Sequence, residues 1–142
     1  MLQDFYCEQL AYTTYIVYIN SERFVMLKHI YYFIDEHDRS PVEDFVKELS
    51  DKESMKVRAY IKILKEYGHA LRRPIADYLG EGIYELRPQA HRVFYFFFMK
   101  DSVVLLHALR KKTDKIPIND FNLCVKRKRE VEALKNIKES DI

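Results

Sequence analysis

The sequence predicts an α+β domain with an antiparallel sheet, two consecutive N-terminal helices on one face of that sheet, and a C-terminal helix. Three observations support this fold class. Residues 82–113 contain three apolar runs of strand length separated by turn-forming residues, which is the pattern of an antiparallel meander. Two adjacent segments with helical spacing lie between residues 40 and 68, and a strand pattern precedes them. Helices in this order pack together on a sheet face.

The composition is typical of one folded domain. The chain has 142 residues, of which 48% are apolar and 32% are charged, and a chain of this length buries roughly 70% of its unfolded surface. Cys7 and Cys124 belong to no CxxC or Cys/His cluster, so we expect neither a zinc site nor a disulfide framework. Common metal and dinucleotide motifs are also missing, and we expect no cofactor. No apolar run approaches the roughly 18 residues of a membrane span, and the N-terminus shows no basic leader. We therefore expect a cytoplasmic protein.

Charge is distributed unevenly along the chain. Residues 1–55 carry 5 Lys and Arg against 11 Asp and Glu, whereas residues 56–142 carry 19 against 11. A basic half of this kind favours a polyanionic partner such as nucleic acid.

The first residues have two interpretations. Residues 1–22 are rich in tyrosine and are β-prone from residue 12 to residue 19. They form either an extra edge strand or a loosely attached extension that precedes a natural start at Met26. We divide the chain into an N-terminal extension of uncertain role, residues 1–22, and a main domain, residues 23–142.

A strand and a helix open the main domain. The β-branched and aromatic residues of 24–34 predict a strand, which the charged residues 35–39 end. Ser40 is suited to cap a helix and Pro41 to its first position. The apolar residues that follow at helical spacing are Val42, Phe45, Val46 and Leu49.

A second helix follows directly. Ser50 is its expected N-cap and Gly68 its expected end. Residues 69–81 are predicted to form a loop with a short helical turn. After the meander of residues 82–113, residues 114–117 read as a linker, and a final helix is expected from Ile118 onward, with a charged, solvated continuation.

The meander contains most of the candidate functional residues. These are Glu85, Arg87, His91, Arg92, Tyr95, His107, Arg110, Lys111 and Lys112. Cations beside aromatic rings suit a site that binds phosphates and stacks bases. Because alternate strand residues share a face, Arg92 is expected with Phe94 and Phe96, and His91 with Tyr95. Since the residues on each face of the strand include large apolar groups, both sides of the sheet should be covered.

Each candidate also has a structural interpretation. Glu85 could neutralise Arg87 or Arg92, and the basic run 110–112 could be a solvated strand end. The two histidines of the meander could be acid-base groups or satisfied residues of the core or rim. Tyr95 could belong to the core, with its hydroxyl as the only group available for catalysis or hydrogen bonding.

The common metal and nucleophile motifs are absent from the sequence. RNA can still be cleaved without them when the 2′-hydroxyl of the substrate acts as the nucleophile. That route requires positioning, proton transfer and charge stabilisation, which a basic site can supply.

Five segments together resemble a known family. RSPVEDFVKEL, GIYELR, HRVFYFF, VVLLHALRKKTDKIP and the C-terminal helix, over about residues 28–131, are similar to the HigB-like, phage-derived branch of the RelE/ParE toxin superfamily. The resemblance implies a RelE-like β-α-α-β-β-β-α fold. It also implies the toxin of a type II toxin-antitoxin system, which cleaves messenger RNA in the ribosomal A site without a metal. An antitoxin, which in such systems can be a helix-turn-helix protein, is the implied partner, together with the ribosome and messenger RNA.

The resemblance also assigns roles to individual residues. It implies that Arg92 holds the scissile phosphate, that Arg87 and Lys112 add positive charge, and that Lys111 or His107 moves protons. Further candidates are Tyr95 for catalysis and, for RNA contact, Arg72, Arg73, Arg110, Lys115 and His91.

Two positions differ from RelE. It has lysine where Glu85 stands, and a C-terminal tyrosine where the comparable position here is near Ile118. Proton transfer must therefore use a different residue.

Two other functions fit the same residues. A ParE-like protein would inhibit DNA gyrase by contact, without chemistry. A non-catalytic RNA-binding domain would show RNA affinity that falls as salt rises.

Overall fold

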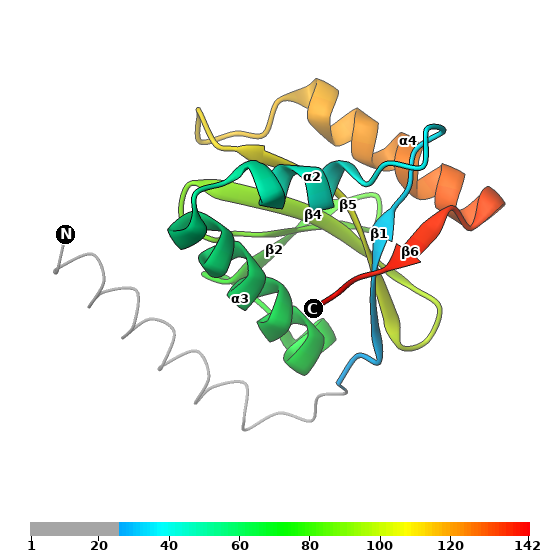
Figure 1. The fold of residues 1–142 in the computed structure, drawn as a ribbon, viewed down its shortest axis with the longest axis horizontal. Helices are drawn as coiled ribbons and strands as arrows, with labels where there is room; N and C mark the ends of the chain where they lie inside the picture. The colour runs from blue at the N-terminus through cyan, green and yellow to red at the C-terminus, as the bar shows by residue number, and fades with distance from the viewer. Residues whose placement is uncertain (1–25) are drawn as a thin grey trace, which may run out of the picture.

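The computed structural model describes residues 26–142, and it confirms the predicted α+β class (Figure 1). The elements along the chain are β1 (His29–Phe33), α2 (Pro41–Glu48), α3 (Asp51–Tyr67), the 3₁₀ turn η1 (Gly68–Ala70), β2 (Ala76–Gly80), β3 (Ile83–Leu86), β4 (His91–Phe98), β5 (Ser102–Arg110), α4 (Ile118–Leu134) and β6 (Ile137–Glu139). The two interpretations of residues 1–22 lie outside the described residues. None of the helices within residues 26–142 is both long and apolar enough to cross a membrane.

The sheet is mixed, with strand order β2-β3-β4-β5-β1-β6. Strands β2 to β5 form an antiparallel meander, as expected for its last three strands, and β6 pairs antiparallel with β1. Strand β1 instead runs parallel to β5, with His29 opposite Ser102. Parallel pairing requires a long crossover, which the two helices and the meander provide. The sequence alone did not predict this pairing.

Strands β2 and β6 occur where no strand was expected. Residues 69–81 were predicted to be a loop, but Ala76–Gly80 pairs with β3. The segment ADYLG contains three residue types that are depleted in strands, Ala, Asp and Gly, so its extended form depends on the neighbouring strand rather than on its own propensity. Strand β6 follows the left-handed C-cap Lys135 and is held by β1.

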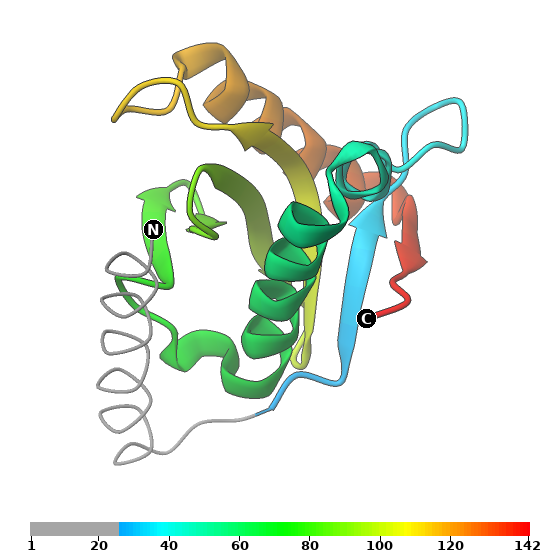
Figure 2. The ribbon, with the colours of Figure 1, turned by 60° about the vertical axis from the view of Figure 1, so that its left-hand side comes forward.

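Helices cover both faces of the sheet (Figure 2). Helices α2 and α3 pack on the face that carries Val93 and Tyr95, and α4 packs on the face that carries Phe94 and Phe96. This sorting follows from the two-residue alternation along β4. The expectation that both faces are covered is therefore correct.

The predicted helix signals act as expected. The hydroxyl of Ser40 accepts a hydrogen bond from the Glu43 amide at 3.2 Å, and that of Ser50 accepts one from the Glu53 amide at 3.3 Å. Gly68 ends α3 with a positive φ of 50°, a conformation that glycine adopts at little cost.

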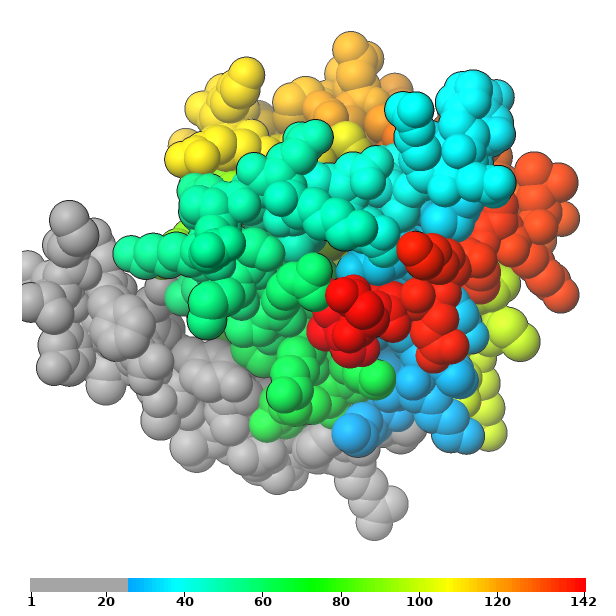
Figure 3. Space-filling model, viewed as in Figure 1, coloured from blue at the N-terminus to red at the C-terminus, as the bar shows by residue number. Residues whose placement is uncertain are grey.

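The last residues lie against α3 and β1 (Figure 3). The Asp141 carboxylate accepts a hydrogen bond from the Tyr32 hydroxyl at 3.1 Å and pairs with Arg58 at 3.1 Å. The Ser140 amide donates to the Ile30 carbonyl at 2.8 Å. These contacts hold the C-terminal residues against α3 and β1.

Candidate functional site

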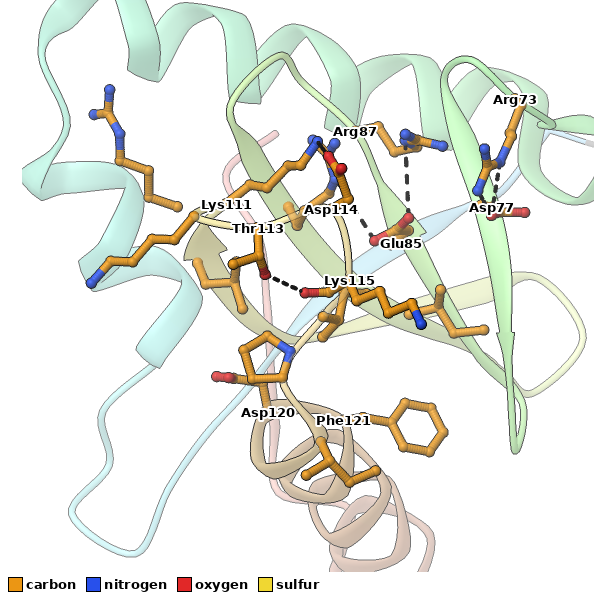
Figure 4. Close-up of a pocket in the computed structure, with 18 residues that line it drawn as sticks. Arg73, Asp77, Glu85, Arg87, Lys111, Thr113, Asp114, Lys115, Asp120 and Phe121 are labelled. Atoms are coloured by element: carbon orange, nitrogen blue, oxygen red, sulfur yellow. Dashed lines mark hydrogen bonds and ion pairs between the residues drawn. The ribbon is translucent and has the colours of Figure 1, made fainter.

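A cavity of about 700 Å³ opens at the end of the sheet where β2 and β4 begin and β3 and β5 end (Figure 4). Residues 111–117, which link β5 to α4, form one wall. Seven cationic and four acidic side chains line it, so its lining is net positive. The cations are Arg73, Arg87, Arg92, Arg110, Lys111, Lys112 and Lys115, and the acids are Asp77, Glu85, Asp114 and Asp120. Four residues to which the resemblance gave phosphate-binding, charge or proton-transfer roles are all among them, namely Arg87, Arg92, Lys111 and Lys112.

Strand pairing brings Glu85, Arg87 and Arg92 together. The register pairs Glu85 with Phe94 and Leu86 with Val93, which places Arg87 opposite Arg92 just beyond the last pair. The Glu85 carboxylate lies 3.9 Å from Nε of Arg87 and 3.8 Å from Nε of Arg92. Glu85 therefore partly neutralises both arginines while all three line the cavity.

Arg92 is held firmly. It is only 6% exposed, and its Nη1 donates hydrogen bonds to the carbonyls of Gln89 and His91, both at 2.7 Å. Its guanidinium therefore has a defined orientation before any ligand arrives, which lowers the entropic cost of binding an anion.

Burial and charge oppose each other at Glu85. Desolvation raises the pKa of this carboxyl above its ordinary value, and the positive charges of Arg92 and Arg87 only partly offset that effect. Burial likewise lowers the pKa of Arg92, while Glu85 raises it. Oε2 of Glu85 is buried and accepts no hydrogen bond from the described residues. Glu85 is thus a carboxylate of the cavity that can still accept a hydrogen bond and that binds a proton more readily than an ordinary glutamate.

The linker supplies the lysines. The Lys111 amide donates to the Ala90 carbonyl at 2.6 Å, which continues the β4–β5 pairing and fixes where Lys111 starts. Its Nζ lies 3.4 Å from the exposed Asp114 carboxylate. Lys112 and Lys115 are exposed, so their ammonium groups can adapt to a bound anion at little cost.

His107 lies outside this cavity, between β5 and α4. Its Nε2 is 2.8 Å from Oδ1 of Asp120, and Nη1 of Arg127 is 3.4 Å from its Nδ1. An arginine can only donate, so Nδ1 is the acceptor and the proton of the neutral ring sits on Nε2, directed at Asp120. Burial lowers the pKa of His107, although the Asp120 hydrogen bond opposes this. Both ring nitrogens thus have partners, which indicates a structural role for His107. Of His107, Asp120 and Arg127, only Asp120 lines the cavity.

Two other expected site residues lie on the opposite face of the sheet, and a third reaches only the cavity rim. Tyr95 is 1% exposed in the core beneath α2 and α3. His91 is 4% exposed and packs edge-on against Phe45 at a centroid distance of 5.7 Å. Arg110 touches the cavity rim, but its guanidinium pairs with Glu53 of α3 at 3.3 Å. The strand alternation that places Arg92 in the cavity directs residues 91 and 95 away from it.

The two adjacent arginines before β2 differ in placement. Nη1 of Arg72 donates to the carbonyls of His69 and Leu71 at 2.6 and 2.8 Å, and Arg72 does not line the cavity. Arg73 does line it, and forms an ion pair with Asp77 at 2.8 Å. Figure 4 shows this pair beside the Glu85–Arg87 pair.

Among the residues of the cavity wall that sequence reasoning missed are Asp77, Asp120 and Phe121. Asp77 belongs to the unpredicted strand β2, and the other two begin α4. Only the first turn of that helix, where acidic residues are favoured, gave a local signal for Asp120. Within residues 26–142, no three His, Cys, Asp or Glu side chains cluster in a way that could hold a metal ion.

The fold and the cavity together define a class, the small α+β proteins of RelE-like fold. The chain belongs to the family of phage-derived Gp49-like proteins (DUF891), whose sequence profile matches residues 44–129, more than half of the chain. This is a RelE/HigB-type toxin family, associated with toxin-antitoxin systems. The matched residues run from α2 into α4 and include every residue that lines the cavity. No curated protein matches the chain at a significant level.

Proposed function

We propose that this chain is the toxin of a type II toxin-antitoxin system and that it cleaves messenger RNA on the ribosome without a metal ion. The observation that carries the proposal is the cavity in which Arg87, Arg92, Lys111 and Lys112 meet at the end of the sheet. Such a concentration of positive charge suits a phosphodiester, and the family is associated with toxins. Ribosome-dependent action would place the protein in the cytoplasm.

The geometry supports a definite division of roles. The fixed guanidinium of Arg92, with Arg87 beside it, would bind the scissile phosphate and stabilise the negative charge that develops on it. The 2′-oxygen would attack phosphorus and the bond to the 5′-oxygen would break, giving a cyclic phosphate and a 5′-hydroxyl. Lys111 and Lys112 would add positive charge, and Lys111 would return a proton to the 5′-oxygen.

Glu85 is the candidate for removing the proton from the 2′-hydroxyl. Its Oε2 lies 3.8 Å from Nε of Arg92 but accepts no hydrogen bond from the described residues, and its pKa is raised, both of which favour proton acceptance. The resemblance assigned proton transfer to Lys111 or His107, and His107 has both ring nitrogens engaged outside the cavity. We therefore assign the base role to Glu85 rather than to His107.

Mapping message ends in cells tests this proposal. The chain would be expressed without an antitoxin, and transcript ends would be located by primer extension. We expect cleavage with the wild type and its loss in Arg87→Ala and in the double variant Lys111→Ala/Lys112→Ala. The matched control is Lys52→Ala/Lys62→Ala, which removes two exposed lysines of α3 and should leave cleavage intact.

The result also separates the competing functions. Growth arrest with intact transcripts would contradict ribonuclease action, and induction of DNA damage in the same cells would indicate gyrase inhibition. RNA affinity without toxicity would indicate a non-catalytic binding domain.

The toxin-antitoxin family implies an antitoxin partner. We propose that this partner covers the cavity with acidic residues, since the lining is net positive. A helix-turn-helix antitoxin is the kind that we expect.

A further inference from the structure

The cavity wall formed by residues 111–117 carries lysines, and the turn that follows it is attached to the sheet by a side-chain hydrogen bond. Asp120 lies in the first turn of α4, where its amide donates to the Pro117 carbonyl at 3.1 Å. Its Oδ1 lies 2.8 Å from Nε2 of His107 in β5 and accepts the proton of that nitrogen. Figure 4 shows Asp120 at the start of the helix, beside the wall. The end of the wall is therefore held against β5 through Asp120.

The imidazole of His107 has a fixed orientation. It stacks on the Phe94 ring at a centroid distance of 5.7 Å and an interplanar angle of 18°. Its Nδ1 lies 3.4 Å from Nη1 of Arg127, which also donates to the Leu106 carbonyl at 2.8 Å. Because these neighbours hold the ring, Nε2 presents its proton to the first turn of α4 in one direction.

The charge of Asp120 opposes the function proposed for the cavity. A carboxylate in the lining repels a bound phosphate, so by charge alone its removal should strengthen anion binding. Asp114 has the same charge on the same wall, but its side chain is fully exposed and pairs with Lys111 at 3.4 Å. The side chain of Asp120 is 29% exposed and is bonded to His107. A comparison of the two aspartates therefore separates the effect of charge from that of attachment.

We propose that Asp120 is a positioning residue for anion binding, which through its hydrogen bond to His107 holds residues 111–117 where their lysines reach a phosphodiester in the cavity. The proposal rests on the proposed function, since it assumes that Arg87 and Arg92 bind a phosphate of RNA. It adds that an acidic residue strengthens anion binding here, because a wall that is fixed in advance loses less conformational entropy when the ligand binds.

Binding of an uncleavable phosphodiester tests this role separately from cleavage. The probe is the deoxydinucleotide TpT, which lacks the attacking 2′-hydroxyl, and its affinity for the full chain would be measured from amide shifts in NMR. We expect Asp120→Ala to bind TpT about fivefold more weakly than the wild type, because the attachment is lost. Charge alone predicts the opposite sign, since the variant has one carboxylate fewer in the lining.

Three further variants distinguish attachment from charge. Asp114→Ala removes a carboxylate from the wall and keeps the attachment, so it should bind TpT as tightly as the wild type or about twofold more tightly. Asp120→Asn keeps an oxygen that can accept from Nε2 of His107 and should restore at least the wild-type affinity. His107→Phe keeps a ring beside Phe94 and removes the donor, which breaks the same bond from the other side. It should weaken binding as Asp120→Ala does, and the double variant should bind no more weakly than either single variant.

Three outcomes would overturn the proposal. They are TpT binding by Asp120→Ala that equals or exceeds that of the wild type, an Asp120→Asn variant as weak as Asp120→Ala, and no binding of TpT to the wild type. If transcripts stay intact in cells but TpT affinity depends on the bond between Asp120 and His107, the positioning role stands and the ribonuclease proposal fails. If transcripts are cleaved and Asp120→Ala binds TpT normally, only the positioning role fails.

Discussion

At the scale of single residues, the most informative group is the trio of Glu85, Arg87 and Arg92. The two arginines share one carboxylate but differ in surroundings. Arg92 is buried and donates two backbone hydrogen bonds, whereas the side chain of Arg87 is 23% exposed and its ion pair with Glu85 is long, at 3.9 Å. The two should therefore contribute differently to stability, although both are proposed to bind phosphate.

From the sequence alone, Arg92→Ala is expected to leave the fold nearly intact, but the buried contacts change that expectation. The substitution leaves Glu85 with one weaker partner and frees two carbonyls, so we expect it to lower the free energy of unfolding by about 2–3 kcal/mol. Arg87→Ala should cost less than about 1 kcal/mol. Urea unfolding of both variants measures the difference, and equal losses would contradict it.

Glu85 should give stability a distinct pH dependence. Because desolvation raises its pKa in the folded state, the folded chain binds a proton more readily than the unfolded chain. Its contribution is complete below the unfolded pKa and is lost as pH rises through the folded value. The wild type should therefore gain stability relative to Glu85→Gln when pH falls from 7.5 to 5, as measured by urea unfolding.

The control for this experiment is Glu48→Gln, which changes an exposed carboxylate at the end of α2. Its stability relative to the wild type should vary little over the same range. A difference between the wild type and Glu85→Gln that stays constant with pH would contradict the assignment.

At the scale of elements, helix starts are set locally and strand partners are not. Ser40 and Ser50 each satisfy a backbone amide of the first helical turn, as their positions in the sequence predict. Strand β2, in contrast, exists because β3 lies beside it. The cavity combines the two, since β2 and β3 form one wall, and residues 111–117 with the start of α4 form another.

Removing either cap should destabilise the protein measurably. We expect Ser40→Ala and Ser50→Ala each to lower the free energy of unfolding by about 1 kcal/mol, because one amide loses its acceptor. Ser54→Ala, within the first turns of α3, is the control and should cost less. Chemical unfolding measures all three, and a control that is as destabilised as the cap variants would rule out capping as the cause.

At the scale of the whole molecule, the cavity and the C-terminal residues lie at different places on the sheet. The cavity and its positive charge lie at the end where β5 leads into α4, while the C-terminal residues close the surface between α3 and β1. Helices on both faces bury the sheet, and that burial takes His91 out of water and leaves His107 half-buried, while His69 stays exposed and stacks on Phe97. Desolvation lowers the pKa of His69, His91 and His107 in the folded state.

Acidification should therefore destabilise the molecule through these histidines. Unfolded imidazoles titrate near pH 6.5, so their contribution to stability is complete above that value and decreases as pH falls through it. Since Glu85 acts with the opposite sign, the measurement belongs in the Glu85→Gln background. We expect its urea midpoint to fall between pH 8 and pH 5.5, and a rising midpoint would contradict the prediction.

The sequence by itself determined the helix boundaries at Ser40, Ser50, Gly68 and Ile118 and the three-stranded meander of residues 82–113. It also determined the alternation that separates Arg92 from His91. These features depend on local capping, turn chemistry and the two-residue period, which are visible in any short stretch of chain.

Only the tertiary structure decided which residues meet. The parallel pairing of β1, the strands β2 and β6, the sharing of Glu85 by two arginines and the placement of Asp77 and Asp120 in the cavity all involve partners far apart in the sequence. The exclusion of His107 and Tyr95 from the cavity likewise depends on what covers them. Desolvation, register and ion pairing are properties of the assembled sheet and its helices, so no single segment carries a signal for them.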